Sequence, residues 1–179
     1  QVGAFDRRIK AVVSQSPGVN GWEMVRAMNR ADQFHDLLEM LTQERIRRYK
    51  EGTVKYVKIV APEGEPSLTQ DAESRAFFAH IAETCPTWRN EMALHSLEKA
   101  LEYNPGANIH LISPTPLLMI VPTHDNIGQT DLALGAYQRA LEPKALLLIK
   151  GGHFAVHADP GFSQAAEAAA GWFRRHLAG

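Results

Sequence analysis

The sequence is poor in cysteine and lacks any long apolar run. Cys85 is the single cysteine among 179 residues, so no disulfide can form within the chain. Such scarcity is typical of proteins in reducing compartments. No run approaches the roughly 18 apolar residues of a membrane-spanning helix, and no signal or transit segment is visible near Gln1. We therefore expect a cytoplasmic protein without a membrane partner.

An excess of charge of one sign is also lacking. The chain has 19 Lys and Arg against 20 Asp and Glu, a formal net charge of −1, which gives no electrostatic basis for binding nucleic acid. The phosphate-binding patterns GxGxxG and GxxxxGK are absent, and no His or Cys cluster has the spacing of a metal site. The sequence therefore predicts neither a cofactor nor a metal. The composition, 45% hydrophobic and 22% charged, suits an ordinary globular domain.

Two short apolar runs in the last third of the chain are each followed by a polar residue. The first run, 117–121, leads into a turn that contains Asp125, and the second, 145–149, leads into Gly-Gly-His153. Both runs are too short for helices and are bounded by Pro or Gly, which favours buried strands. Asp125 and His153 would then follow neighbouring strands of one sheet.

The flanking segments complete a pattern of alternating strands and helices. A helix is predicted from about Asp131 to Leu141, with Thr130 as its N-cap. Residues 9–13 predict a further strand, and 162–177 predict a terminal helix that covers one face of the sheet. This pattern indicates the α/β class.

The order of strand, acid-bearing turn, helix, strand and His-bearing loop resembles the last third of the α/β-hydrolases, whose triad runs Ser…Asp/Glu…His along the chain. The phrases SPTPLLMIV, GGHF and RIKAVVSQ are similar to dienelactone-hydrolase-like members, in particular a fungal branch that releases or transfers polyketide chains. The resemblance implies a mostly parallel sheet flanked by helices. In it, 1–17 and 109–179 form the C-terminal part of the hydrolase core, and 18–108 form a helical cap. It also implies a triad acid at Asp125 and a triad base at His153.

Simpler interpretations exist for these residues and their neighbours. Taken singly, Asp125 and His153 could be ordinary turn and loop residues, but their spacing and strand context together favour a catalytic pair. His124 precedes the acid, where a triad base is not expected. His157 lies within one turn of His153 and could contact the base without contacting the substrate. Asp131 suits the first turn of a helix, where it complements the dipole.

The nucleophile that such a pair requires is missing from the sequence. No G-x-S-x-G occurs, and Ser14, Ser16 and Ser113 lack the flanking glycines of the nucleophile turn. We interpret these serines as strand-end and turn residues. Cys85 lacks the basic surroundings of a reactive thiol. We therefore expect the serine and the oxyanion donors to lie upstream of Gln1, and the chain alone to be inactive.

The predicted cap is mostly helical. Helices are expected within 22–49, from Thr69 or Asp71 onward, and over 88–103, while the charged run 44–50 predicts a solvated helix face. A cap walls an acyl pocket and excludes water. Large apolar side chains that could line the pocket are Trp22, Met24, Met28, Phe34, Phe77, Phe78, Trp88, Met92 and Tyr103.

Among these side chains, we select as substrate-binding candidates Trp22, Met28, Phe77, Phe78 and Trp88. The alternative is that they merely hold the cap helices together, since aromatic residues dominate ordinary packing.

Two functional hypotheses follow. In the first, the chain provides the acid and base of a serine hydrolase that hydrolyses or transfers the acyl group of a small carboxylic ester or thioester, without a cofactor. In the second, it is a truncated, catalytically inactive relative that acts as a binding or interaction protein. An open sheet edge would then favour a homodimer.

Overall fold

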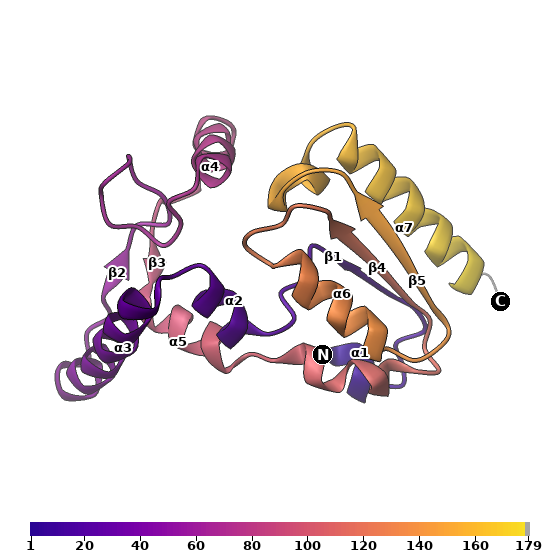
Figure 1. Cartoon of the computed structure of the whole chain (residues 1–179), viewed down its shortest axis with the longest axis horizontal. Coiled ribbons are helices and arrows are strands. Elements are labelled where there is room, and N and C mark those ends of the chain that lie inside the picture. Colours follow the sequence, from indigo (N-terminus) through magenta and orange to yellow (C-terminus); the bar gives the residue numbers. More distant parts are fainter. Residues whose placement is uncertain (178–179) are drawn as a thin grey trace. The chain divides into compact units, whose positions relative to one another are not determined.

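The computed structural model describes residues 1–177 and divides the chain into two compact units (Figure 1). Unit 1 contains 1–28 and the chain from Tyr103 onward, and unit 2 is 29–102. Unit 2 falls within the segment 18–108, whose role as a cap stays a prediction. Over the described 177 residues, no helix combines the length and the apolar character needed to cross a bilayer.

Unit 1 is built on three parallel strands in the order β1-β4-β5, namely Val12–Gln15, Leu117–Pro122 and Lys144–Ile149. The two apolar runs are therefore strands, as predicted. Every residue of the central strand β4 is buried, as expected for a parallel strand that is covered on both faces. β1 begins later than the predicted residues 9–13, because it pairs from Val12 with the first residue of β4.

Alternate residues of β4 face opposite layers, a consequence of the two-residue repeat of a strand. On one face, Leu117, Met119 and Val121 pack in a core with α6 (Thr130–Arg139) and the 3₁₀ helix η1 (Pro105–Ile112). The short helix α1 (Val2–Phe5) contributes Ala4 to the same core.

On the other face, Leu118 and Ile120 pack with Trp172 of α7 (Gly161–Leu177). Val156 of the 3₁₀ helix η2 (His153–His157) joins this second core. Figure 1 shows α6 and α7 on opposite sides of the sheet. The predicted parallel sheet flanked by helices is confirmed.

The helix between the two site-bearing strands is fixed at its C-terminal end by a lysine. Lys144 Nζ, from the start of β5, donates to the carbonyl oxygens of Tyr137 at 2.9 Å and Ala140 at 2.7 Å. The ammonium also lies 4.6 Å from the centre of the Tyr137 ring. A cation at the last turn of a helix complements the dipole and the unpaired carbonyls there.

Unit 2 consists of α3 (Ala31–Glu51), α4 (Ala72–Thr84) and α5 (Leu94–Glu102) with a two-stranded antiparallel ribbon. The ribbon pairs β2 (Tyr56–Val57) with β3 (Met92–Ala93). The helix predicted over 88–103 therefore begins six residues later than predicted, at Leu94, because Met92 and Ala93 pair with β2 and residues 88–91 are not helical.

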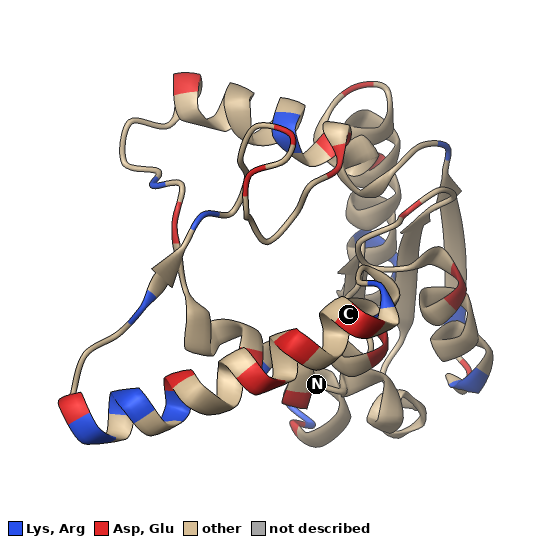
Figure 2. Ribbon diagram, turned by 60° about the vertical axis from the view of Figure 1, so that its left-hand side comes forward, with Lys and Arg blue, Asp and Glu red and all other residues tan. Residues whose placement is uncertain are grey.

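The charged run of α3 is the predicted solvated face only in part: Arg45 and Lys50 are exposed, whereas Glu44 is not. Glu44 is buried and accepts hydrogen bonds from Arg47 and from the backbone N–H of Lys55. Glu98 of α5 forms ion pairs with Arg45 at 2.6 Å and Arg48 at 3.4 Å. Figure 2 shows the basic residues of this helix in its C-terminal half, with acidic residues among them. The run therefore packs α3 against α5 through paired charges.

The remaining helix, α2 (Gly21–Ala27), belongs to unit 1. Asn20 caps it: its side-chain oxygen accepts the backbone N–H of Glu23.

The burial of β4 between the two cores predicts that truncating a buried side chain costs more stability than truncating an exposed one. Ile120 is 0% exposed in β4, whereas Leu148 in β5 is 49% exposed. Ile120→Ala should lower the free energy of unfolding of unit 1 by about 2–5 kcal/mol, because it leaves a cavity between the layers. Leu148→Ala should cost less than about 1 kcal/mol. Hydrogen exchange of the β4 amides measures both, and equal losses would contradict the burial that we describe.

Candidate active site

The structure brings the two predicted site residues into contact. Asp125 follows β4 and His153 follows β5, and the carboxyl ends of these parallel strands lie at the same edge of the sheet. Asp125 Oδ2 lies 2.9 Å from His153 Nδ1, with side-chain exposures of 3% and 20%. A buried carboxylate is thus paired with an imidazole that still reaches solvent.

The turn after β4 orients the carboxylate. Asp125 Oδ1 accepts the backbone N–H groups of Ile127 at 2.8 Å and Gly128 at 2.7 Å. Such side-chain-to-backbone bonds are typical of Asx turns. One carboxylate oxygen is therefore held by the backbone of the turn, and the other is left for His153.

Thr130 fixes the same turn from the start of α6. Its hydroxyl accepts the N–H of Asp125 at 2.9 Å and donates to the carbonyl oxygen of Pro122 at 2.7 Å. The sequence pattern predicts Thr130 as the helix N-cap. That prediction is wrong, because Thr130 is already helical and Gln129 occupies the cap position. Nothing in the local pattern except the hydroxyl itself signals the role that the structure shows.

Hydrogen bonds from backbone amides also join the acid-bearing and His-bearing loops directly. The His124 N–H donates to the carbonyl oxygen of Gly151 at 2.8 Å, and the Gly151 N–H donates to Thr123 Oγ1 at 3.3 Å. The Thr123 N–H in turn donates to the carbonyl oxygen of Ile149 at 2.9 Å. These bonds continue the β4–β5 pairing beyond the strands and fix the two loops relative to each other.

Several opposing effects set the charge of the acid. Burial raises the pKa of the Asp125 carboxyl, but the hydrogen bond and charge of His153 and the amides of Ile127 and Gly128 outweigh it. The pKa therefore lies below its ordinary value of 3.8, and Asp125 is a carboxylate at neutral pH. A carboxylate facing Nδ1 keeps the proton on that nitrogen and leaves Nε2 free to accept one.

The rival residues differ from Asp125 and His153 in their surroundings. His124 is exposed, and its Nδ1 lies 2.8 Å from Thr123 Oγ1. Burial, followed by the charge of His153, lowers the pKa of the His157 imidazole. Asp131 is exposed in the first turn of α6, and Cys85 is exposed in unit 2.

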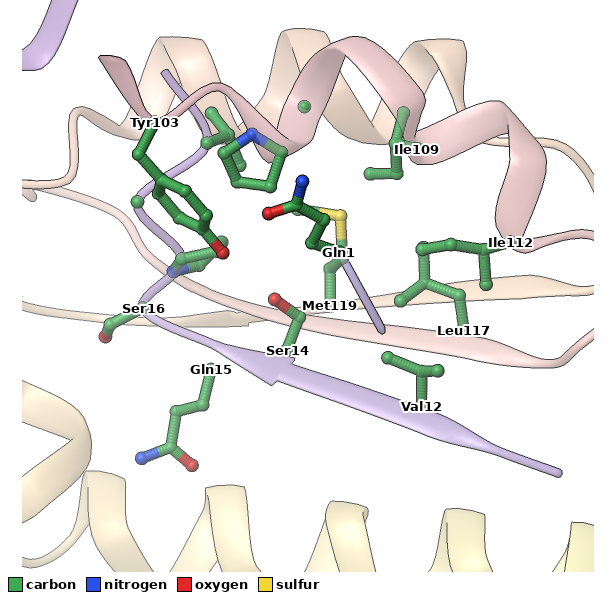
Figure 3. Close-up of a pocket in the computed structure, with 15 residues that line it drawn as sticks. Gln1, Val12, Ser14, Gln15, Ser16, Tyr103, Ile109, Ile112, Leu117 and Met119 are labelled. Carbon is green, nitrogen blue, oxygen red and sulfur yellow. The ribbon is translucent and has the colours of Figure 1, made fainter. Parts of the chain in front are cut away.

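A cavity of about 330 Å³ lies beside β1 in unit 1. It is lined by apolar residues of β1, β4 and η1 and by the polar side chains of Gln1, Ser14 and Ser16. Figure 3 shows the Ser14 hydroxyl pointing into it. Ser16 Oγ donates to the carbonyl oxygen of His153 at 3.3 Å, so the wall of this cavity is connected to the base. The third serine, Ser113, donates to the carbonyl oxygen of Glu142 at 2.7 Å.

The five substrate-binding candidates fall into two groups. Phe77, Phe78 and Trp88 lie together in unit 2, where Phe78 stacks on Trp88 with ring centroids 5.6 Å apart and meets Phe77 edge to face. Phe78 and Trp88 line a cavity of about 350 Å³. Trp22 and Met28 belong to unit 1, in and just after α2, and both are exposed. That any of these residues contacts a substrate stays a prediction.

The low pKa of Asp125 predicts how stability depends on pH. A group whose pKa is depressed by folding stabilises the protein above its unfolded-state pKa, and the contribution is lost as pH falls. The wild-type protein should therefore lose stability relative to Asp125→Asn as the pH falls below about 3.8, its ordinary value. Urea midpoints between about pH 6 and pH 2.5 would measure the difference. A constant difference across this range would contradict the assignment.

The acid turn also predicts that Gly128 is intolerant of a side chain. A Cβ at this position would lie 2.8 Å from Asp125 Oδ2, the oxygen that meets His153. Gly128→Ala should displace the carboxylate and lower the free energy of unfolding by about 1–3 kcal/mol. Gly135→Ala in α6 is the control, since its Cβ would meet only Arg139 Nη1 at 3.7 Å. It should stabilise the helix by up to about 1 kcal/mol. Denaturant unfolding of both variants tests the contrast.

The chain is similar in sequence to fungal proteins named as polyketide transferases and a thiohydrolase. No protein-family model matches the chain. It is 24% identical over 170 residues to polyketide transferase claH of Penicillium crustosum, an alignment covering 89% of this chain and 53% of that protein. It is 24% identical over 154 residues to thiohydrolase aneE of Aspergillus aculeatus, covering 79% and 46%. The chain thus spans about half the length of these relatives.

A solved structure matches nearly the whole chain. The crystal structure of the α/β hydrolase GrgF from Penicillium sp. superposes with a TM-score of 0.77 at 21% identity, covering 99% of this chain and 59% of that one. The predicted fold is thereby confirmed: the chain has the fold of part of an α/β-hydrolase. In sequence it is similar to fungal polyketide transferases and a thiohydrolase, as the motifs suggested.

Proposed function

We propose that this chain supplies the catalytic acid and base of a serine hydrolase that acts on a carboxylic ester or thioester. The observation that carries the proposal is the 2.9 Å contact between Asp125 Oδ2 and His153 Nδ1 at the carboxyl ends of adjacent parallel strands. The side chains have the polarity and exposure that the roles require: a buried carboxylate orients the ring, and the ring remains accessible.

The proposed reaction passes through an acyl-enzyme. His153 Nε2 removes the proton of a serine hydroxyl as its oxygen attacks the acyl carbonyl carbon, and Asp125 stabilises the imidazolium that forms. The imidazolium then gives its proton to the departing alcohol or thiol. Water, or an acceptor hydroxyl or amine, is deprotonated in the same way and attacks the acyl-enzyme, which regenerates the serine. Hydrolysis and transfer differ only in this second nucleophile.

The proposal assigns the serine to polypeptide outside these 179 residues. The sequence holds no G-x-S-x-G, and the hydroxyls of Ser16 and Ser113 donate to backbone carbonyls. The matched relatives are about twice as long as the part that this chain covers. The oxyanion donors, one of which is the amide that follows the serine, would come from the same polypeptide.

The relatives also suggest a class of substrate. Their names describe polyketide transfer and thiohydrolysis, both of which fit a polyketide acyl chain delivered as a thioester. We propose that unit 2 acts as the cap that selects this chain, with Phe77, Phe78 and Trp88 as aromatic contacts. The cavity beside Phe78 and Trp88 is apolar on most of its walls, as an acyl-binding site requires.

Substitution of the base in the complete protein tests the pair. His153→Ala should lower kcat for a p-nitrophenyl ester or thioester by about 10⁴-fold or more, and Asp125→Asn by about 10⁴-fold. The matched control is His124→Ala, which removes the neighbouring imidazole and should retain activity. Wild-type turnover by His153→Ala would disprove the assignment.

The location of the nucleophile has a separate test. The 179-residue chain should show neither turnover nor labelling by a fluorophosphonate probe, because its own serines lack the turn that activates one. Intact mass would reveal a single adduct if one formed. Labelling at Ser14, Ser16, Ser113 or Cys85 would show that the chain contains its own nucleophile and would overturn this part of the proposal.

A further inference from the structure

Three residues in the described part of unit 1 have a positive backbone φ, and each follows a different strand of the sheet. Ser16 (φ 41°) follows β1, Gln129 (φ 61°) lies in the acid-bearing turn after β4, and Gly151 (φ 135°) follows β5. Glycine adopts such values freely, but serine does so only at a cost. Strained residues of this kind tend to gather at functional sites, where the surrounding structure holds them.

Ser16 is held from two sides. Its backbone N–H donates to the carbonyl oxygen of Ile120 at 2.9 Å, which extends the β1–β4 pairing by one residue. Its hydroxyl donates to the carbonyl oxygen of His153 at 3.3 Å. The left-handed conformation therefore occurs at the residue that connects the end of β1 to the backbone of the base.

Without the hydrogen bond from Ser16, the His-bearing loop would be held mainly by the segment that precedes Asp125. Gly151 exchanges hydrogen bonds with Thr123 and His124, just before Asp125. These bonds hold the loop at its start, two residues before His153. The bond from Ser16 acts on His153 itself and comes from the opposite neighbour of β4. Together the two sets of bonds define the direction in which the imidazole leaves the backbone.

We propose that Ser16 is a positioning residue for His153, and that its left-handed backbone conformation is retained because it directs the hydroxyl to the His153 carbonyl. This inference rests on the proposed function for its catalytic meaning. The hydrogen bond between Asp125 and His153, however, can be observed without catalysis. Relaxing the backbone at this position should therefore stabilise unit 1 while loosening the base, a trade-off expected where strain serves function.

Three substitutions separate the backbone from the hydroxyl. Ser16→Gly accepts the left-handed conformation but has no donor, Ser16→Ala has neither property, and Ser16→Asn tolerates this conformation and keeps an N–H donor. Ser14→Ala removes a hydroxyl two residues away, which points into the neighbouring cavity, and is the matched control. All can be made in the 179-residue chain.

The readout is the downfield proton resonance of His153 Nδ1, together with hydrogen-exchange protection of the β4 amides. Ser16→Gly should raise the protection but weaken or shift the resonance, and Ser16→Ala should weaken both. Ser16→Asn should restore the resonance, and Ser14→Ala should leave it unchanged. In the complete enzyme, Ser16→Gly should lower kcat about tenfold with KM unchanged, the effect of one lost hydrogen bond.

A wild-type resonance in both Ser16→Gly and Ser16→Ala would overturn the role of Ser16. Asp125→Asn separates this failure from that of the proposed function, because it should abolish the resonance whatever the role of Ser16. If the resonance persists in Asp125→Asn, the acid–base pair is wrong, and the proposed function fails with it.

Discussion

The parallel pairing of β4 with β5 is the constraint on which the rest of unit 1 depends. Because the strands run in the same direction in a fixed register, with Pro122 opposite Ile149, their loops leave the sheet at the same edge. This places Asp125 and His153, which are far apart in sequence, close enough for the turn and loop contacts to bring them to 2.9 Å. The two apolar cores hold the register. A slip of one residue along β4 would move the side chains that pack in the core of Met119 into the core of Ile120 on the opposite face, and the reverse.

The site combines a charge that is expensive to bury with groups that compensate for it. The carboxylate of Asp125 loses its hydration, but two backbone amides and an imidazole replace the water. Thr130 then satisfies the N–H of the same residue. The acid turn is therefore a closed network in which each polar group of Asp125 has a partner, and this fixes the geometry of its contact with His153.

Much of unit 1 could be read from the sequence, because its signals are local. The runs at 117–121 and 145–149 are apolar and bounded by Pro or Gly, which identifies them as strands. Asp125 and His153 follow these runs, at the end of the sheet where parallel neighbouring strands both finish. The errors arose where tertiary contacts override local preference. Met92 and Ala93, just before α5, are extended because they pair with β2. Glu44 in the charged run of α3 is buried because Arg47 and the backbone N–H of Lys55 compensate its charge. The conformation of Ser16 could not be predicted, since the following Pro17 signals a turn without specifying φ.

The fixing of α6 at both ends has a consequence for the length of the chain. At its start, Thr130 is bonded to the acid turn, and just beyond its end Lys144 holds the last carbonyls from the first residue of β5. An α-helix turns by about 100° per residue, so one inserted or deleted residue would swing one attachment away from its partner. Evolution can therefore exchange side chains along the exposed face of α6 freely, but we expect relatives that keep both attachments to keep the number of residues between them.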